Sequence, residues 1–213
     1  MKKRILEPVF ITRFLSLSVT LCLCLNSWLC AQASGFTDVP EDQYCYVPVQ
    51  WAVERGITAG TSPTTFAPGD TCTKGQVLTF LWRAVGSPEP DLPEINPFPL
   101  ASEDAYYYKA LHWALSAGAL YDTLDFDFDQ VDPDAPCTRL TAIFYMWSVL
   151  GYLPENLEHP FTDIAFSIYT PAVAWALEAC VTEGTAPTVF SPDDICTRGQ
   201  VVTFLFRALY LTE

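Results

Sequence analysis

Three basic residues occupy the same place in a recurring motif, directly after a threonine. The motifs are Thr73-Lys74-Gly-Gln, Thr138-Arg139-Leu-Thr and Thr197-Arg198-Gly-Gln. An apolar stripe at helical spacing follows each one, so each cation falls in the first turn of a predicted helix. A cation there opposes the helix dipole by roughly 0.3–1 kcal/mol. This predicts an anion beside the helix start, where free backbone N–H groups also point, unless each cation pairs with a nearby aspartate or is merely inherited with the repeat.

These motifs belong to a pattern that the chain repeats three times. Trp51 and Trp175 are 124 positions apart, and so are Cys72 and Cys196, so two of the copies share one internal spacing. We place repeat one at 35–88, repeat two at 96–150 and repeat three at 160–213. Repeat two is the divergent copy. The connectors are rich in proline and acidic residues, as linkers are.

Each repeat is predicted to fold as helix, loop, helix. In repeat one the first helix covers about 44–55, and the second starts at Thr73. Two capping boxes, Thr73-x-x-Gln76 and Thr197-x-x-Gln200, mark the starts of second helices. One helix pair cannot bury its own apolar face, so the three repeats are expected to pack around shared helices in an all-α fold.

The pattern resembles the S-layer homology domain. The resemblance rests on Phe-Thr-Asp-Val at 36–39 with its echo at 161–164, on the block 51–60, and on Phe-x-Pro followed by Thr-[Lys/Arg]-x-Gln. It implies a pseudo-threefold bundle of three helix-loop-helix repeats. It also implies non-covalent binding of a secondary cell-wall polymer, often pyruvylated, in grooves between repeats.

The resemblance also suggests which residues bind. The family's second helix begins with Thr-Arg-Ala-Glu, whose arginine contacts the polymer; the acidic fourth residue is absent from all three motifs here. We rank Arg198 first, Arg139 second and Lys74 third, because only a guanidinium can grip a carboxylate with two parallel hydrogen bonds. Leu100 replaces the aspartate of the other repeats and Asp122 replaces their loop glycine, so the groove of repeat two is expected to be damaged.

Loop and aromatic residues complete the candidate list. Possible ligand donors, which are equally good turn residues, are Gly60, Thr61, Ser62, Gly184 and Thr185. Asp38 and Asp163 are expected to cap the first helices rather than contact a ligand. Core packing is expected for Trp51, Trp113 and Trp175. Sugar stacking is open, beside simple packing, for Tyr44, Tyr46 and Tyr106–Tyr108.

Five cysteines lie beyond residue 33, of which Cys72, Cys137 and Cys196 share one repeat position. We expect buried thiols. A disulfide between two of the three, a bond from Cys45 to a neighbour, and a three-cysteine zinc site are alternatives, although the paired spacing of typical zinc sites is missing. The acidic run 122–129 begins like a calcium loop but lacks its glycine and bidentate glutamate. No metal or cofactor is therefore predicted.

The N-terminus is typical of an export signal. A basic stretch ends at Arg13, an apolar run covers 14–25, and Ala31-Gln-Ala33 predicts cleavage after Ala33, making residues 1–33 a signal peptide. An uncleaved anchor and a lipidated Cys30 are the alternatives. No later segment is long and apolar enough to span a membrane. We expect a secreted protein of the cell wall or cell surface.

Charge excludes one class of partner and shapes the functional prediction. The formal charge is −14, and residues 1–33 carry +3, so the rest carries −17. Such acidity argues against nucleic-acid binding. His112 and His159 have no motif that would make a catalytic set. The sequence predicts a non-catalytic module that anchors to an anionic cell-wall polysaccharide; the alternative is an adaptor that binds another surface protein.

Overall fold

The computed structural model describes residues 35–121, 127–165 and 167–210. The chain forms two compact units, Met1–Gly35 and Phe36–Glu213, and the second unit contains the helices of all three repeats. The predicted export signal lies outside the described residues and stays a prediction. Within the described ranges no helix has both the length and the apolar character needed to cross a membrane.

Each repeat contributes two helices to the second unit. They are α2 (Tyr46–Glu54) and α3 (Lys74–Ala84) from repeat one, α4 (Tyr108–Ser116) and α5 (Arg139–Leu150) from repeat two, and α6 (Thr170–Glu178) and α7 (Arg198–Tyr210) from repeat three. A short 3-10 helix, η1 (Phe128–Gln130), precedes α5. Apart from isolated β-bridges, the described residues contain no strand. The predicted all-α fold is confirmed.

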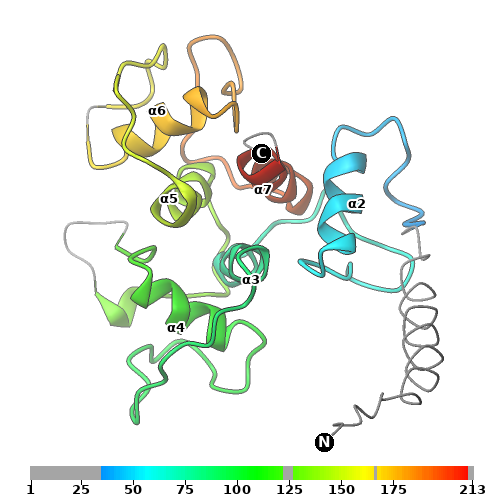
Figure 1. Cartoon of the computed structure of the whole chain (residues 1–213), viewed down its shortest axis with the longest axis vertical. Helices are drawn as coiled ribbons and strands as arrows, with labels where there is room; N and C mark the ends of the chain where they lie inside the picture. The colour runs from blue at the N-terminus through cyan, green and yellow to red at the C-terminus, as the bar shows by residue number, and fades with distance from the viewer. Residues whose placement is uncertain (1–34, 122–126, 166, 211–213) are drawn as a thin grey trace, which may run out of the picture. The chain divides into compact units, whose positions relative to one another are not determined.

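The second helices of the repeats pack together in the middle of the unit, and the first helices pack around them (Figure 1). Each first helix packs on the second helix of the preceding repeat, α4 on α3 and α6 on α5. The series closes on itself, because α2 of repeat one packs on α7 of repeat three. Each junction in this ring is therefore built from two different repeats.

The capping boxes predicted at two second helices are present. Thr73 Oγ1 accepts from the Gln76 N–H at 3.3 Å, and Gln76 Oε1 accepts from the Thr73 N–H at 3.2 Å. The same pair of bonds joins Thr197 and Gln200, at 3.3 and 2.9 Å. These reciprocal bonds satisfy N–H groups that would otherwise be orphaned at the helix start.

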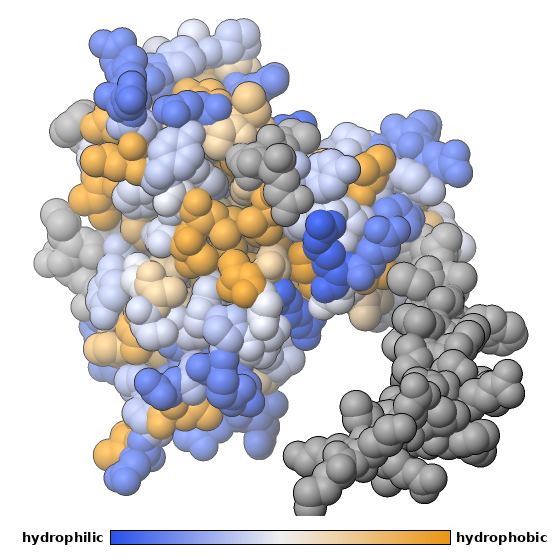
Figure 2. Space-filling view, viewed as in Figure 1, coloured by the Kyte–Doolittle hydropathy of each residue, from blue (hydrophilic) through white to orange (hydrophobic). Residues whose placement is uncertain are grey.

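The three repeat tryptophans are buried, as predicted, and one of them helps to close the ring. Trp51 on α2 meets Phe206 on α7 edge to face, with ring centroids 5.5 Å apart. Such aromatic pairs add stabilisation beyond the burial of their area. Figure 2 shows apolar side chains gathered over the central helices on the face in view, with hydrophilic side chains around them.

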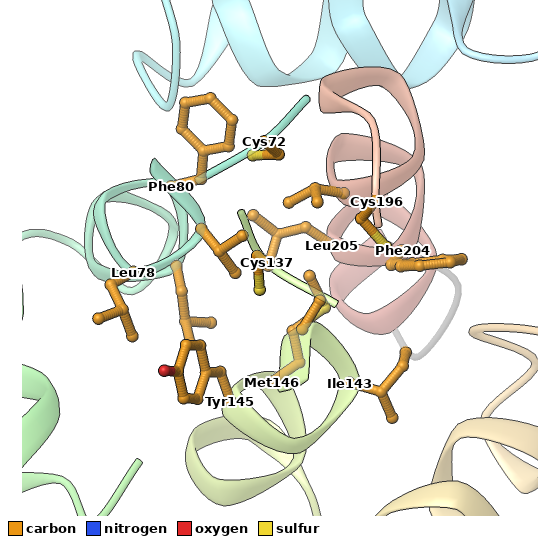
Figure 3. Close-up of a cluster of buried hydrophobic side chains, with 14 of the residues drawn as sticks. Cys72, Leu78, Phe80, Cys137, Ile143, Tyr145, Met146, Cys196, Phe204 and Leu205 are labelled. Carbon is orange, nitrogen blue, oxygen red and sulfur yellow. The ribbon is translucent and has the colours of Figure 1, made fainter. Parts of the chain in front are cut away.

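Cys72, Cys137 and Cys196 lie close together in the core (Figure 3), and their backbones form a closed cycle of three hydrogen bonds. The Cys72 N–H donates to the Cys196 carbonyl, the Cys196 N–H to the Cys137 carbonyl, and the Cys137 N–H to the Cys72 carbonyl, each at 2.9 Å. All three side chains are buried, as is Cys45, whereas Cys180 is exposed. No described cysteine is in a disulfide, and no group of three His, Cys, Asp or Glu residues in the described ranges is arranged to hold a metal.

Burial predicts that these thiols are unreactive in the folded state. It raises the pKa of Cys72 to about 12 and that of Cys196 to about 11, so both stay protonated at pH 8 and make poor nucleophiles. In a chain that begins at Ser34, the residue after the predicted cleavage position, iodoacetamide at pH 8 is expected to modify Cys180 alone. Intact-mass spectrometry would then show one adduct in native protein and five in urea, and Cys180→Ser would remove the native adduct. Several rapid adducts on the native protein would contradict the burial of the three core cysteines.

Candidate functional site

The three predicted cations are the first residues of α3, α5 and α7, and each helix start is bonded to the loop of another repeat. The Arg198 N–H donates to Asp70 O at 2.9 Å, and the Gly199 N–H to Pro68 O at 3.0 Å. The prediction that free N–H groups point at a ligand here is therefore wrong. The next N–H, that of Gln200, is taken by the capping threonine, so the side chains alone can serve a ligand.

Arg198 lies between two phenylalanine rings of repeat one. Its guanidinium carbon is 4.8 Å from the ring centroid of Phe66, in the loop, and 5.5 Å from that of Phe80, on α3. Its Nε donates to the Phe66 carbonyl at 3.0 Å. The side chain is only 5% exposed. The rings act as cation–π partners, but they supply no opposite charge.

Arg139 has the same surroundings, provided by repeat three. Its guanidinium carbon is 5.1 Å from the ring centroid of Phe190 and 4.9 Å from that of Phe204. One terminal nitrogen donates to the Thr182 hydroxyl. The residue is 6% exposed, and its buried Nε has no hydrogen-bond partner. A buried guanidinium with an unused donor is costly unless something pairs with it.

Neither arginine has a counter-ion close by. Among the described residues, the single ion pair within 4.0 Å joins Lys109 and Glu89. Burial lowers the pKa of both guanidiniums. The nearby Cys196 and Asp194 raise the pKa of Arg139 in part, and Cys72 and Asp70 are the main residues that raise that of Arg198. Arginine stays charged despite such shifts. Each site is thus a desolvated positive charge open to compensation by an anion.

The aspartates expected to cap the first helices hold the phenylalanine loops instead. Asp38 accepts from the Phe66 and Ala67 N–H groups at 2.9 and 2.7 Å. Asp163 accepts from the Phe190 and Ser191 N–H groups at 2.9 and 2.7 Å. The physical reason is the left-handed backbone at the second residue of each pair, with φ of 59° and 61°, which turns consecutive N–H groups to one side.

The first helices themselves have no side-chain cap. The residues before α2, α4 and α6 are Cys45, Tyr107 and Tyr169, and none accepts a capping hydrogen bond through its side chain.

The loop hydrogen bonds of Asp163 lower the pKa of its carboxyl group. Burial raises this pKa, but the hydrogen bonds from Phe190 and Ser191 outweigh burial, so the net pKa is lowered. Its contribution to stability is therefore present at neutral pH and is lost as the pH falls through the folded-state pKa.

The loop residues proposed as ligand donors are bonded within their own turns. The Thr61 and Ser62 N–H groups both donate to Thr65 O, and the Thr185 N–H donates to Val189 O. The Gly60 and Gly184 N–H groups donate to the hydroxyls of Thr58 and Thr182. This supports the turn interpretation. Because Thr182 also meets Arg139, the turn fixes a hydroxyl that the arginine uses.

Lys74 lies at the junction between repeats one and two, where the residues differ from those around Arg139 and Arg198. Its N–H donates to Ala135 O at 3.0 Å, so α3 starts on the loop of repeat two. Leu100, at the aspartate position, is exposed and cannot accept a hydrogen bond through its side chain. Val131 stands where Phe66 and Phe190 stand in the other loops. The acidic run 122–129 falls largely outside the described residues, and only its last three residues are described.

The tyrosines divide between the core and the surface. Tyr107 is buried, whereas Tyr44 and Tyr106 are 59% and 55% exposed. Burial raises the pKa of Tyr106, and its hydrogen bond with Thr73 lowers this pKa in part. Burial likewise raises the pKa of Tyr44, and its hydrogen bond with Thr197 lowers it in part. An exposed tyrosine ring therefore lies beside the cap of α3 and another beside the cap of α7. Both remain candidates for contact with a sugar.

Sequence reasoning missed the rings that enclose the arginines. The repeat pattern includes Phe66 and Phe190 in its Phe-x-Pro element, and Phe80 and Phe204 lie in the helices that follow, but nothing in the pattern indicates that these rings lie beside the arginines. The signal that could have found these rings is their constant distance in sequence from the repeat cysteine. Phe80 and Phe204 each lie eight positions after it, and repeat two has Tyr145 at that position. The two histidines pack on rings. His112 meets Phe98 and Tyr108 edge on, and His159 stacks on Phe161.

The fold and the site together define a class: a closed set of helix-loop-helix repeats with buried cations at two junctions. The family model of the S-layer homology domain matches residues 35–78 and 160–202, which lie in repeats one and three. These matches support the S-layer homology family and, with it, anchoring at the cell surface.

One curated relative, an endoglucanase from Bacillus sp. (strain KSM-635), is 24% identical to this chain over 221 residues. The alignment covers 96% of this chain but 23% of the relative, so the chain spans about a quarter of that protein. The enzymatic name describes the whole relative.

Proposed function

We propose that this chain is a non-catalytic module that attaches its carrier to the cell wall by binding carboxylate groups of an anionic wall polymer. The observation that carries the proposal is the pair of buried arginines, each held between two phenylalanine rings without a counter-ion within 4.0 Å among the described residues. A carboxylate at either guanidinium would supply the missing charge. Charge-assisted hydrogen bonds of this kind are the strong ones.

Burial restricts what can reach these sites. Because Arg198 and Arg139 are only 5% and 6% exposed, little of either guanidinium is open to a ligand, and a small anionic group such as a carboxylate is the ligand that we propose. The charge of −17 beyond residue 33 opposes the approach of a polyanion at long range. At physiological salt this repulsion is screened beyond about 8 Å, whereas the contacts within the grooves are not.

Co-sedimentation with sacculi tests the proposal. A chain that begins at Ser34, the residue after the predicted cleavage position, contains the whole unit Phe36–Glu213. It is mixed at 0.15 M NaCl with sacculi that keep their polymer and with sacculi stripped of it. We expect the protein in the pellet only when polymer is present, and release by soluble polymer fragments. Equal sedimentation with stripped sacculi would overturn polymer binding. It would favour an adaptor that binds peptidoglycan or a surface protein.

A further inference from the structure

An open pocket of about 480 Å³ lies between the last turn of α3 and the start of α4. Three aromatic and three charged side chains line it, namely Trp82, Tyr106, Tyr108, Glu103, Asp104 and Lys109. The cations at the starts of α3, α5 and α7 are not among its lining residues. The chemistry of this pocket is therefore separate from that of the buried arginines.

The rings of the pocket are held in place by contacts with residues outside its lining. Trp82 Nε1 donates to Pro88 O at 2.8 Å. Tyr106 is hydrogen-bonded to Thr73, at the cap of α3. Tyr108 is half-buried on the first turn of α4. Because these side chains are already ordered, a ligand that stacks on them loses little affinity to ordering costs.

The charged side chains leave the pocket negative. Lys109 Nζ is 2.5 Å from Glu89 Oε1, so a carboxylate outside the lining compensates its charge. Glu103 and Asp104 have no cation within 4.0 Å among the described residues. Burial lowers the pKa of the nearby His112, against a smaller opposing effect of Glu103, so the imidazole is neutral at pH 7 and adds no positive charge. Two carboxylates are thus open to a cation.

We propose that this pocket binds an ammonium group, carried by a hexosamine whose amine is not acetylated. The faces of tryptophan and tyrosine rings attract a cation, and carboxylates accept charge-assisted hydrogen bonds from it. The volume suits a small molecule, and the acidic field of the domain concentrates cations near its surface. This site goes beyond the proposed function, since it shares no residue with the arginine sites and takes a ligand of opposite charge.

The corresponding junction between α5 and α6 lacks two of the three rings. Ile168 and Thr170 stand at the positions of Tyr106 and Tyr108, counted back from the repeat tryptophan. A tryptophan near the end of α5, Trp147, is retained, and its Nε1 also donates to a backbone carbonyl. We therefore expect no ammonium site there, and Trp147 is a matched control for the tryptophan of the pocket.

Repeat one keeps the two tyrosines but meets a different ring. Tyr44 and Tyr46 stand at the positions of the pocket tyrosines, and Phe206 on α7 stands at the position of the pocket tryptophan. Phe206 stacks on Tyr210, with ring centroids 4.9 Å apart, and meets Trp51 edge to face. Its ring is thus already engaged, so we expect one ammonium site per chain.

NMR titration of the chain that begins at Ser34 tests this proposal at pH 7. The probes are the methyl glycoside of glucosamine, whose amine is largely protonated at this pH, and its N-acetylated form. We expect one site for the amine and at least about tenfold weaker binding of the N-acetylated probe. Trp82→Ala is expected to weaken amine binding about tenfold, and Trp147→Ala to leave it unchanged. Glu103→Gln, at an exposed residue, is expected to weaken it several-fold without affecting folding.

Each other outcome has a definite meaning. Equal binding of the two glycosides, or equal effects of the two tryptophan variants, would overturn the ammonium site. Tighter binding of Nα-acetyl-lysine methylamide than of the glucosaminide would overturn the sugar and indicate a peptide ligand. The variant with both Arg139→Met and Arg198→Met is expected to keep the ammonium site while it loses wall polymer, so failure of this inference is distinguishable from failure of the proposed function.

Discussion

Gly184→Ala is expected to lower the free energy of unfolding by about 3 kcal/mol, combining a left-handed backbone that opposes a Cβ with a steric overlap that forces the core apart. Gly184 has φ of +87°, and a Cβ built on it would lie 2.5 Å from Phe161 Cε1 and 2.6 Å from Val189 O. The Phe161 ring is buried, and the Val189 carbonyl accepts the Thr185 N–H at 2.8 Å, so neither can move freely. Equilibrium unfolding in urea would measure the loss.

Gly56→Ala is the matched control for this prediction. Gly56 also has a left-handed backbone, with φ of +68°, but a Cβ there would meet nothing within 4 Å. Only the backbone term applies, so the expected loss is about 1 kcal/mol. Equal losses in the two variants would mean that the Gly184 turn relaxes around the new methyl group. The turn would then not hold Thr182 rigidly beside Arg139.

The variant with both Arg139→Met and Arg198→Met is expected to bind wall polymer at least about 100-fold more weakly, since each buried charge-assisted contact is worth several kcal/mol once its partner is lost. Its thermal midpoint is expected to be unchanged or higher. Methionine fills a similar volume between the phenylalanine rings, and replacing buried charge by an apolar side chain of similar volume is often neutral or stabilising. Sedimentation and thermal unfolding give the two readouts.

The combination of readouts distinguishes binding from structure. If the arginines served only to hold repeats together, losing the bonds to Phe66 O and Thr182 would lower the thermal midpoint. Binding would then fall only with unfolding. A folded protein with an unchanged or higher thermal midpoint that no longer sediments with wall polymer would show that the buried arginines serve binding and cost stability. A destabilised protein that still binds would contradict it.

Local features of the sequence were predictable because they depend on neighbours in the chain. The capping boxes at Thr73 and Thr197, the helix that follows each, and the burial of Trp51 and Trp175 all come from spacing within one turn or one helix. The position of Arg139 and Arg198 in the first turn was predictable for the same reason. These predictions are confirmed by hydrogen bonds and burial.

The site itself could not be predicted from local rules, because it is assembled across repeats. Asp38 precedes α2 in the sequence and was expected to cap it, but α2 begins only at Tyr46, and the partners of Asp38 are the N–H groups of Phe66 and Ala67, 28 and 29 residues away. The burial of the arginines depends on how α7 meets repeat one, which no spacing within a repeat encodes. The satisfied N–H groups at the helix starts have the same origin.

Closure of the ring also bears on how such a chain can change over evolutionary time. Because α2 packs on α7, deleting or adding one repeat would leave an apolar helix face and a broken cysteine ring, so the number of repeats is fixed. Repeat two can therefore drift in its loop while its helices are retained by the demands of its neighbours. We expect the tolerance of this domain to substitution to differ from one junction to another. The Lys74 junction is expected to be the most tolerant, and therefore the most suitable for engineering a new specificity.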